Sequence, residues 1–154
     1  MIKRTFLCTM LVLLTVQAAV LVSPAIAQQA EDIGRHWVHY NTFNTAFLTP
    51  EVARAYGIDR SGQRSLLNIA VVRKNESGLD TPVRARVSAR ASNLAGQQRD
   101  LEMREIVDGD AIYYIASFRI HNRERLNFVV DVEPLDGASR RSTVRFQQTF
   151  YIEE

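Results

Sequence analysis

Hydrophobic and polar residues alternate with period two along most of the chain after Gly57. The alternation covers residues 83–92, 101–104, 112–119, 126–133 and 144–152, and its clearest example is Val83, Ala85, Val87, Ala89 and Ala91 against Arg84, Arg86, Ser88, Arg90 and Ser92. Such a pattern predicts β-strands with one buried face. Residues 66–72 form a near-continuous apolar run, which predicts a central strand covered on both sides.

Turn residues separate these strands at positions 75–80, 93–96, 108–109 and 136–137. Asp108-Gly109 favours a tight hairpin, because a type I′ turn needs positive φ at its two central residues. Folding about the turns near Ala95 and Asp108-Gly109 places Leu101 opposite Ala89 and Ala116, Met103 opposite Val87 and Tyr114, and Arg90 opposite Asp100. The two registers bury the same face of the middle strand, so we expect a three-stranded meander.

Residues 49–57 depart from the alternation. Thr49 is a typical N-cap, Pro50 suits the first helical position and Gly57 is a typical stop, so we expect a helix of about two turns near residues 50–56. Residues 36–43 form an additional strand of mixed character. About seven strands and one short helix predict an all-β fold, a two-sheet sandwich of the immunoglobulin-like class, with an open barrel as the alternative.

The first 27 residues have the order of a secretory signal peptide. Lys3 and Arg4 precede an apolar stretch from position 6 to 22, and small residues end the segment at Ala27. We expect cleavage after about Ala27 and a single domain over residues 28–154 in the exported protein, with no stable membrane insertion once the signal is removed. An uncleaved membrane anchor is the alternative, since the apolar stretch approaches the length of a short span.

Removal of this segment changes the charge and the cysteine content. The net charge of +2 comes from Lys3 and Arg4, so the remaining acidic and basic residues balance. A neutral domain offers no basic field, which argues against nucleic acid as a partner. The single cysteine, Cys8, is also removed, so we expect no disulfide and no thiolate metal site.

No residue pattern indicates catalysis, a metal or a cofactor. His36 and His39 are three apart in a predicted strand and therefore point to opposite faces, with His121 the only other histidine. The chain contains no G-x-S-x-G motif, and Glu102 and Glu105 fall on opposite faces of a strand. We therefore expect a protein that is not an enzyme.

Aromatic residues and a histidine gather before and within the predicted helix. They are a candidate partner or ligand surface: Trp37, His39, Tyr40, Phe43, Phe47 and Tyr56. The alternative is that these rings pack the helix and its flanking loop onto the sandwich. Arg84, Arg86 and Arg90 form a row on one strand face, which is either a solvated, ion-paired face or an anion contact.

Three strings resemble a known family: Val38 to Phe43 (VHYNTF), Phe47 to Ile58 (FLTPEVARAYGI) and Arg64 to Ile69 (RSLLNI), together with residues 109–114 (GDAIYY). The chain is similar over about residues 33–152 to the bacterial family filed as domain of unknown function 4426. This resemblance implies a small periplasmic protein of Gram-negative bacteria. It implies no activity, cofactor or catalytic residue.

These observations favour a non-enzymatic periplasmic binding module whose partner is another envelope protein. Recognition would use an exposed sheet edge or the aromatic segment between Trp37 and Tyr56. A small-ligand pocket lined by Tyr40, Phe47 and Tyr56 is the alternative, and a hydrolase is a further one.

Overall fold

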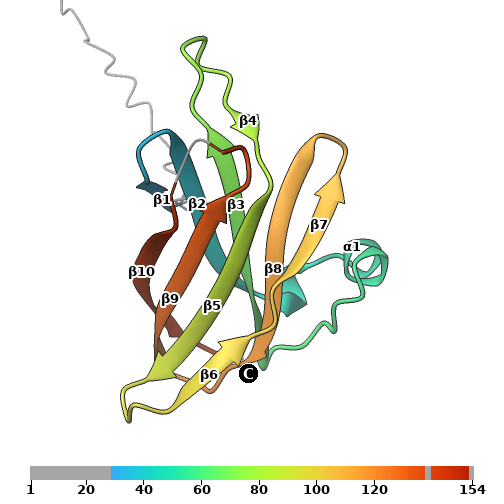
Figure 1. The fold of residues 1–154 in the computed structure, drawn as a ribbon. Helices are drawn as coiled ribbons and strands as arrows, with labels where there is room; N and C mark the ends of the chain where they lie inside the picture. Colours follow the sequence, from blue (N-terminus) through green and yellow to red (C-terminus); the bar gives the residue numbers. More distant parts are fainter. Residues whose placement is uncertain (1–28, 138–139, 153–154) are drawn as a thin grey trace, which may run out of the picture.

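Two antiparallel sheets pack face to face in the computed structural model, which describes residues 29–137 and 140–152 (Figure 1). The short helix stands to one side of the sandwich, next to the edge of one sheet. The predicted signal peptide lies outside the described residues. Among those residues, no helix is both long enough and apolar enough to cross a membrane.

Six strands form the sheet that carries the helix, here called sheet A. They are β1 (Gln29–Asp32), β2 (His36–Asn44), β3 (Arg64–Arg73), β4 (Thr81–Pro82), β7 (Arg104–Asp108) and β8 (Ala111–Arg119). Their order is β1-β2-β3-β8-β7, and β4 pairs with the C-terminal end of β3. A 3-10 turn, η1 (Thr45–Phe47), and the helix α1 (Pro50–Ala55) connect β2 to β3.

Four strands form the opposite sheet, sheet B. They are β5 (Ala85–Asn93), β6 (Gln98–Leu101), β9 (Glu124–Pro134) and β10 (Ser142–Phe150), in the order β10-β9-β5-β6. The alternating apolar residues of both sheets meet in one core, in which Phe128 stacks on Phe146 at 4.8 Å between ring centroids. The period-two pattern thus builds the interface between the sheets.

The long strand β3 is covered on both faces over part of its length, as its apolar run predicts. Leu67, Ile69 and Val71 are fully buried in the core between the sheets. Leu66 points the other way and is 4 % exposed, because α1 and the segment after it cover that face. The helix α1 therefore packs on the second apolar face of β3.

The two-sheet, all-β sandwich and its short helix near residues 50–56 are confirmed. The immunoglobulin-like subclass stays a prediction. The described residues contain ten strands in place of about seven, because β2 is preceded by the polar strand β1, β4 has two residues and one predicted strand is divided.

The predicted three-stranded meander is wrong. Leu101 does pair with Ala89, and Arg90 with Asp100, but this hairpin belongs to sheet B. The chain leaves the ladder at residues 102–103 and then continues as β7 in sheet A. A strand that changes sheets keeps the same alternation on both sides of the break, so periodicity alone does not reveal the crossing.

The second hairpin is also displaced from its predicted register. Asp108 pairs with Ala111, so Gly109 and Asp110 are the central turn residues, with Gly109 at φ +57°. Tyr114 consequently lies opposite Glu105, two residues beyond the predicted Met103. The shift is even, and it therefore leaves Tyr114 facing the core, where it is 5 % exposed.

Candidate binding site

Helix α1 begins and ends as its sequence predicts. The Thr49 side chain accepts a hydrogen bond from the Val52 amide at 3.3 Å, and Pro50 occupies the first turn. At the other end Gly57 has φ +59°, and the Ile58 amide donates to the Ala53 carbonyl at 2.8 Å. This is a Schellman-type cap, in which an apolar residue after the glycine turns back toward the helix.

A small apolar cluster attaches α1 to sheet A. Ala53 and Ile58 are 3 % and 9 % exposed and pack against Leu66 of β3 and Ile115 of β8. Arg104 of β7 adds a polar attachment, since its guanidinium donates a hydrogen bond to the backbone carbonyl of Tyr56. The helix is thus held mainly at its C-terminal end.

A pocket of about 190 Å³ remains between α1 and the outer face of sheet A, the face directed away from sheet B. We call it the α1 pocket. Its walls come from the helix segment and from strands β2, β3, β7 and β8: Phe43, Leu48, Val52, Tyr56, Ile58, Leu66, Asn68, Ile106, Asp108, Tyr113 and Ile115. Nine of these eleven side chains are aromatic or aliphatic, so the pocket is suited to an apolar group.

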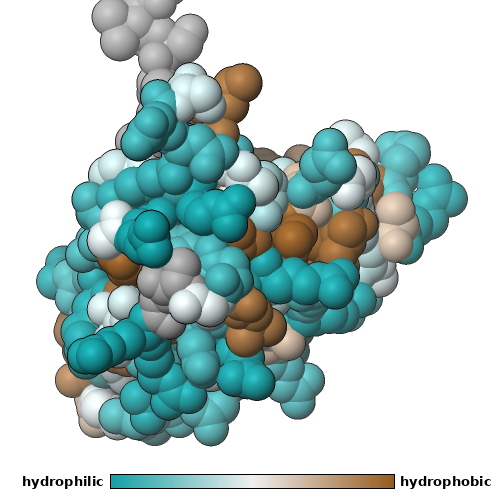
Figure 2. Space-filling model, turned by 45° about the horizontal axis from the view of Figure 1, so that its top comes forward, coloured by the Kyte–Doolittle hydropathy of each residue, from teal (hydrophilic) through white to brown (hydrophobic). Residues whose placement is uncertain are grey.

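The rim of the α1 pocket joins apolar and polar groups. Val52 is exposed on the helix, and Asp108 stands at the end of β7. The Asp108 carboxylate beside the Tyr56 hydroxyl raises the pKa of Tyr56 above its ordinary value of 10.0. Figure 2 shows apolar side chains gathered on the right-hand side of the molecule, the side of α1 and the β7–β8 hairpin in Figure 1.

Beyond the pocket, the outer face of sheet A continues over β2 and β3. Trp37, His39 and Asn41 lie on this face with Asn68, the register partner of Asn41. His39 Nδ1, Asn41 Oδ1 and Asn68 Oδ1 are buried atoms without a hydrogen-bond partner among the described residues. Buried polar atoms normally find partners, so this part of the face has unused hydrogen-bonding capacity.

Five of the six predicted surface residues lie outside the core between the two sheets. Trp37, His39 and Phe43 share the outer face of sheet A, and Phe43 and Tyr56 line the α1 pocket. Phe47 is 71 % exposed on η1, outside the pocket lining.

Tyr40 lies on the opposite face of β2. Its ring stacks on Phe146 of sheet B at 4.4 Å and packs against the sandwich core. The three rings Tyr40, Phe47 and Tyr56 therefore do not form a common pocket. Tyr40 and Phe43 are three apart in one strand, so alternation assigns them to opposite faces.

Several pocket residues were not predicted from the sequence. Ile106 and Tyr113 belong to the β7–β8 hairpin, and Asn68 lies within the apolar run of β3. Only the packing of α1 onto the sheet brings them together. The one available signal was Asn68 itself, a polar residue inside an otherwise apolar stretch.

The three histidines occupy separate environments. His36 is fully buried, with Nε2 2.8 Å from Asp136 Oδ2, and Arg73 Nη1 lies 3.7 Å from the same oxygen. His121 lies on an exposed turn, where its Nδ1 is 3.3 Å from Glu124 Oε2. In the described part of the chain, no three His, Cys, Asp or Glu side chains are grouped as metal ligands.

The arginine row on β5 and before it is largely ion-paired. Arg84 Nε lies 3.4 Å from Glu105, and Arg86 Nη1 lies 3.3 Å from Glu133. Arg90 stands opposite Asp100 in the β5–β6 ladder. These contacts favour the solvated, ion-paired interpretation of this face.

The similarity to known proteins extends over the whole sandwich. The profile described as "Domain of unknown function (DUF4426)" matches residues 30–153. The chain belongs to the DUF4426 family. A DUF4426 family protein from Pseudomonas aeruginosa PAO1, with a crystal structure at 2.09 Å resolution, is 35 % identical with a TM-score of 0.70. The match covers 82 % of this chain and 96 % of the Pseudomonas chain, and no curated protein matches this DUF4426 member.

The DUF4426 sandwich also resembles FetP from uropathogenic Escherichia coli strain F11, which was expressed recombinantly in the periplasm. That structure is 11 % identical, has a TM-score of 0.57, and the match covers 82 % of this chain and 95 % of FetP. A copper-bound variant of FetP is 12 % identical with a TM-score of 0.56, covering 80 % and 95 % of the two chains. At this identity the likeness shows a shared fold.

Proposed function

We propose that this DUF4426 protein is an exported, non-enzymatic accessory protein of the bacterial envelope that binds another envelope protein through the α1 pocket. The observation that carries the proposal is the open apolar hollow between α1 and sheet A. The signal-like sequence before residue 28 and the fold shared with FetP, a protein expressed in the periplasm, support the location.

The size of the pocket favours a side chain of a partner protein. Sites for drug-sized ligands occupy roughly 300–1,000 Å³, whereas an engineered cavity of roughly 150 Å³ holds a single benzene ring. At about 190 Å³, the α1 pocket accommodates one ring-sized group. An anchoring aromatic or aliphatic side chain in such a pocket is a common centre of a protein interface.

The surroundings of the pocket suit a larger protein surface. The apolar hollow is bordered by the rest of the outer face of sheet A, where Trp37 lies with Lys74 Nζ 4.2 Å from its ring centroid. His39, Asn41 and Asn68 add polar atoms that lack internal partners. An apolar anchor surrounded by polar groups is the usual anatomy of a protein–protein interface.

Site-specific photocrosslinking in living cells tests the proposal. A benzophenone amino acid at Phe47, which is exposed next to the helix segment, reports on the pocket side of the molecule. The same amino acid at Arg90, on the opposite sheet, provides the matched background position. We expect a discrete crosslinked envelope protein from position 47 alone.

A charge at the rim makes the test specific. Val52→Arg places a cation over the α1 pocket and should abolish the crosslink from position 47. Val107→Arg is the control, because Val107 is an exposed valine of the neighbouring hairpin on the face opposite Ile106. An equal crosslink from position 90, or a crosslink that survives Val52→Arg in a folded protein, would contradict the proposal. Saturable binding of a free metabolite to the purified protein, lost in Val52→Arg, would instead favour a small ligand.

A further inference from the structure

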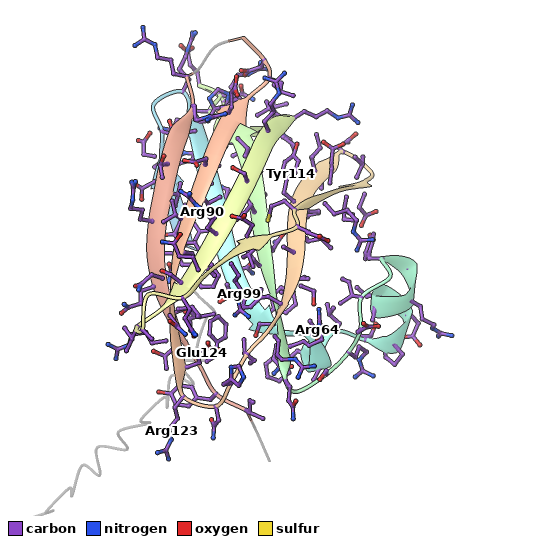
Figure 3. All side chains as sticks on the ribbon, turned by 60° about the horizontal axis from the view of Figure 1, so that its bottom comes forward. Arg64, Arg90, Arg99, Tyr114, Arg123 and Glu124 are labelled. Atoms are coloured by element: carbon purple, nitrogen blue, oxygen red, sulfur yellow. The ribbon has the colours of Figure 1, made fainter. Side chains whose placement is uncertain are left out.

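Arg99 enters the space between the two sheets. It lies in β6 opposite Ala91 of β5, and directly opposed residues of a ladder point to the same face. Ala91 is 1 % exposed in the core, so the Arg99 side chain shares the inner face of sheet B. Figure 3, with the lower end of the molecule turned forward, shows Arg99 at the same end of the sandwich as Glu124.

The Arg99 guanidinium has no polar partner among the described residues. Its central carbon lies 5.4 Å from the Phe118 ring centroid, and its Nη2 atom is buried without a hydrogen bond. The exposed Arg84 and Arg86 both have carboxylates within 3.4 Å. A buried guanidinium nitrogen without a hydrogen-bond acceptor is unfavourable, so an acceptor bound at this position would stabilise the protein.

An open cavity of about 370 Å³ adjoins this side chain. It lies where the β5–β6 turn and the β8–β9 turn meet, and its walls are Ala91, Asn93, Gln97, Gln98, Arg99, His121, Glu124 and Leu126. Asn93 and Gln97 of this wall bond to each other, with Asn93 Nδ2 donating to Gln97 Oε1 at 2.7 Å, and Gln98 and His121 also line the cavity. The volume falls within the range of small-molecule sites, roughly 300–1,000 Å³.

We infer that this cavity is a second binding site, in which Arg99 binds a carboxylate group of a small ligand. The guanidinium presents planar paired N–H donors that match the two oxygens of a carboxylate. Phe118 holds the guanidinium in place by a cation–π contact.

The carboxylate in the cavity favours a monoanion over a dianion. Glu124 lines the same wall, and its Oε2 accepts a hydrogen bond from the His121 amide at 3.0 Å and is 3.3 Å from His121 Nδ1. This carboxylate repels a dianion such as phosphate more strongly than a monocarboxylate. The site shares no lining residue with the α1 pocket, so the inference does not depend on the proposed function.

Thermal unfolding of the purified protein in three sodium salts at equal ionic strength tests the inference. The salts are butyrate as the carboxylate probe, phosphate as the dianionic probe and chloride as the reference. We expect butyrate at saturating concentration to raise Tm by ~2 °C or more above chloride, because a ligand that binds only the native state stabilises it. Phosphate should raise Tm by less.

Two variants locate the effect. Arg99→Met keeps the contact with Phe118 but removes the donors, and it should abolish the butyrate shift without lowering Tm in chloride. Arg90→Met is the matched control, since Arg90 is exposed on the outer face of the neighbouring strand, and it should keep the shift. Should Arg99→Met fail to fold, Arg99→Lys replaces it and should weaken the shift at least roughly tenfold in butyrate concentration, because a lysine lacks the paired donors.

The outcomes separate clearly. No butyrate shift in the wild-type protein, or an equal shift in the folded Arg99 variant, would overturn the site. A phosphate shift as large as that of butyrate would overturn the preference for a carboxylate.

Discussion

Arg104 of β7 donates a hydrogen bond from its guanidinium to the backbone carbonyl of Tyr56, the residue that follows α1. The two residues are 48 positions apart in the chain. Tyr56 and the rest of the helix segment form one wall of the α1 pocket, and Ile106 and Asp108 of β7 form another. This contact, together with the apolar cluster under the helix, therefore sets how far the helix stands from the sheet.

Loss of the Arg104 contact should loosen the helix without unfolding the sandwich. Arg104→Ala leaves the Tyr56 carbonyl without this donor, a loss of about 1 kcal/mol. We expect the amide of Ile58, which is bonded to Ala53, to exchange with solvent roughly fivefold faster. Hydrogen exchange followed by NMR measures this rate. Arg86→Ala, which removes an exposed ion pair of sheet B, should leave it unchanged.

Gly57 ends the helix in a backbone conformation that favours glycine. Its φ of +59° is strained for any residue with a Cβ, so Gly57→Ala should lower the free energy of unfolding by about 1–2 kcal/mol. The added Cβ would be 3.7 Å from Arg104 Nη1, an ordinary contact, so the cost comes from the backbone. Gly62→Ala is the control, with open space around it and no positive φ. Urea denaturation of both variants measures their free energies of unfolding, and equal values would contradict the strain argument.

Tyr114 joins the two halves of the sandwich by its hydroxyl. The Ala85 amide donates to this oxygen at 2.8 Å, and the hydroxyl donates to Glu105 Oε2 at 3.0 Å. Tyr114→Phe leaves a buried amide without its acceptor, and we expect a loss of about 1–3 kcal/mol in the free energy of unfolding. Tyr113→Phe, on the outer face of β8, should cost less than about 0.5 kcal/mol. A neutral effect of Tyr114→Phe in urea titrations would show that the amide finds another acceptor.

The same tyrosine should make the protein sensitive to alkaline pH. Burial, and then the neighbouring Glu105 carboxylate, raise the pKa of Tyr114 above the ordinary value of 10.0. The unfolded chain ionises at about that value while the folded protein does not. Stability is therefore full below about pH 10 and decreases as the pH rises through the elevated pKa of the folded state. Urea midpoints between about pH 8 and 11 should fall less steeply in Tyr114→Phe than in the wild-type protein.

The sequence predicts which face of a strand is buried more reliably than which sheet the strand joins. Alternation correctly placed Phe128 and Val130 of β9 in the core, because burial of every second side chain is a local property. The crossing at Met103 is not local, since it depends on which strand the chain meets next. The polar strand β1 was missed because all four of its residues are exposed and show no alternation.

The candidate site was predicted in part for the same reason. Trp37, His39 and Phe43 follow the alternation of β2 and share one face, and Tyr40 follows it to the other. The pocket itself depends on the packing of a six-residue helix against strands that include the distant β7 and β8. The period-two pattern does not predict how far the helix lies from these strands. The caps of the helix at Thr49 and Gly57, in contrast, could be predicted from the sequence.

Two aromatic residues of β2 should separate the core from the binding surface. Tyr40 stacks on Phe146 between the sheets, so Tyr40→Ala should cost about 3 kcal/mol of unfolding free energy. Trp37 lies on the outer face under Lys74, and Trp37→Ala should cost about 1 kcal/mol or less while weakening the crosslink from position 47. Tyr40→Phe keeps the stack and should retain both stability and crosslink. The reverse result, a crosslink lost in Tyr40→Phe and kept in Trp37→Ala, would move the partner away from the outer face of sheet A, because only Trp37 of these two side chains lies on that face.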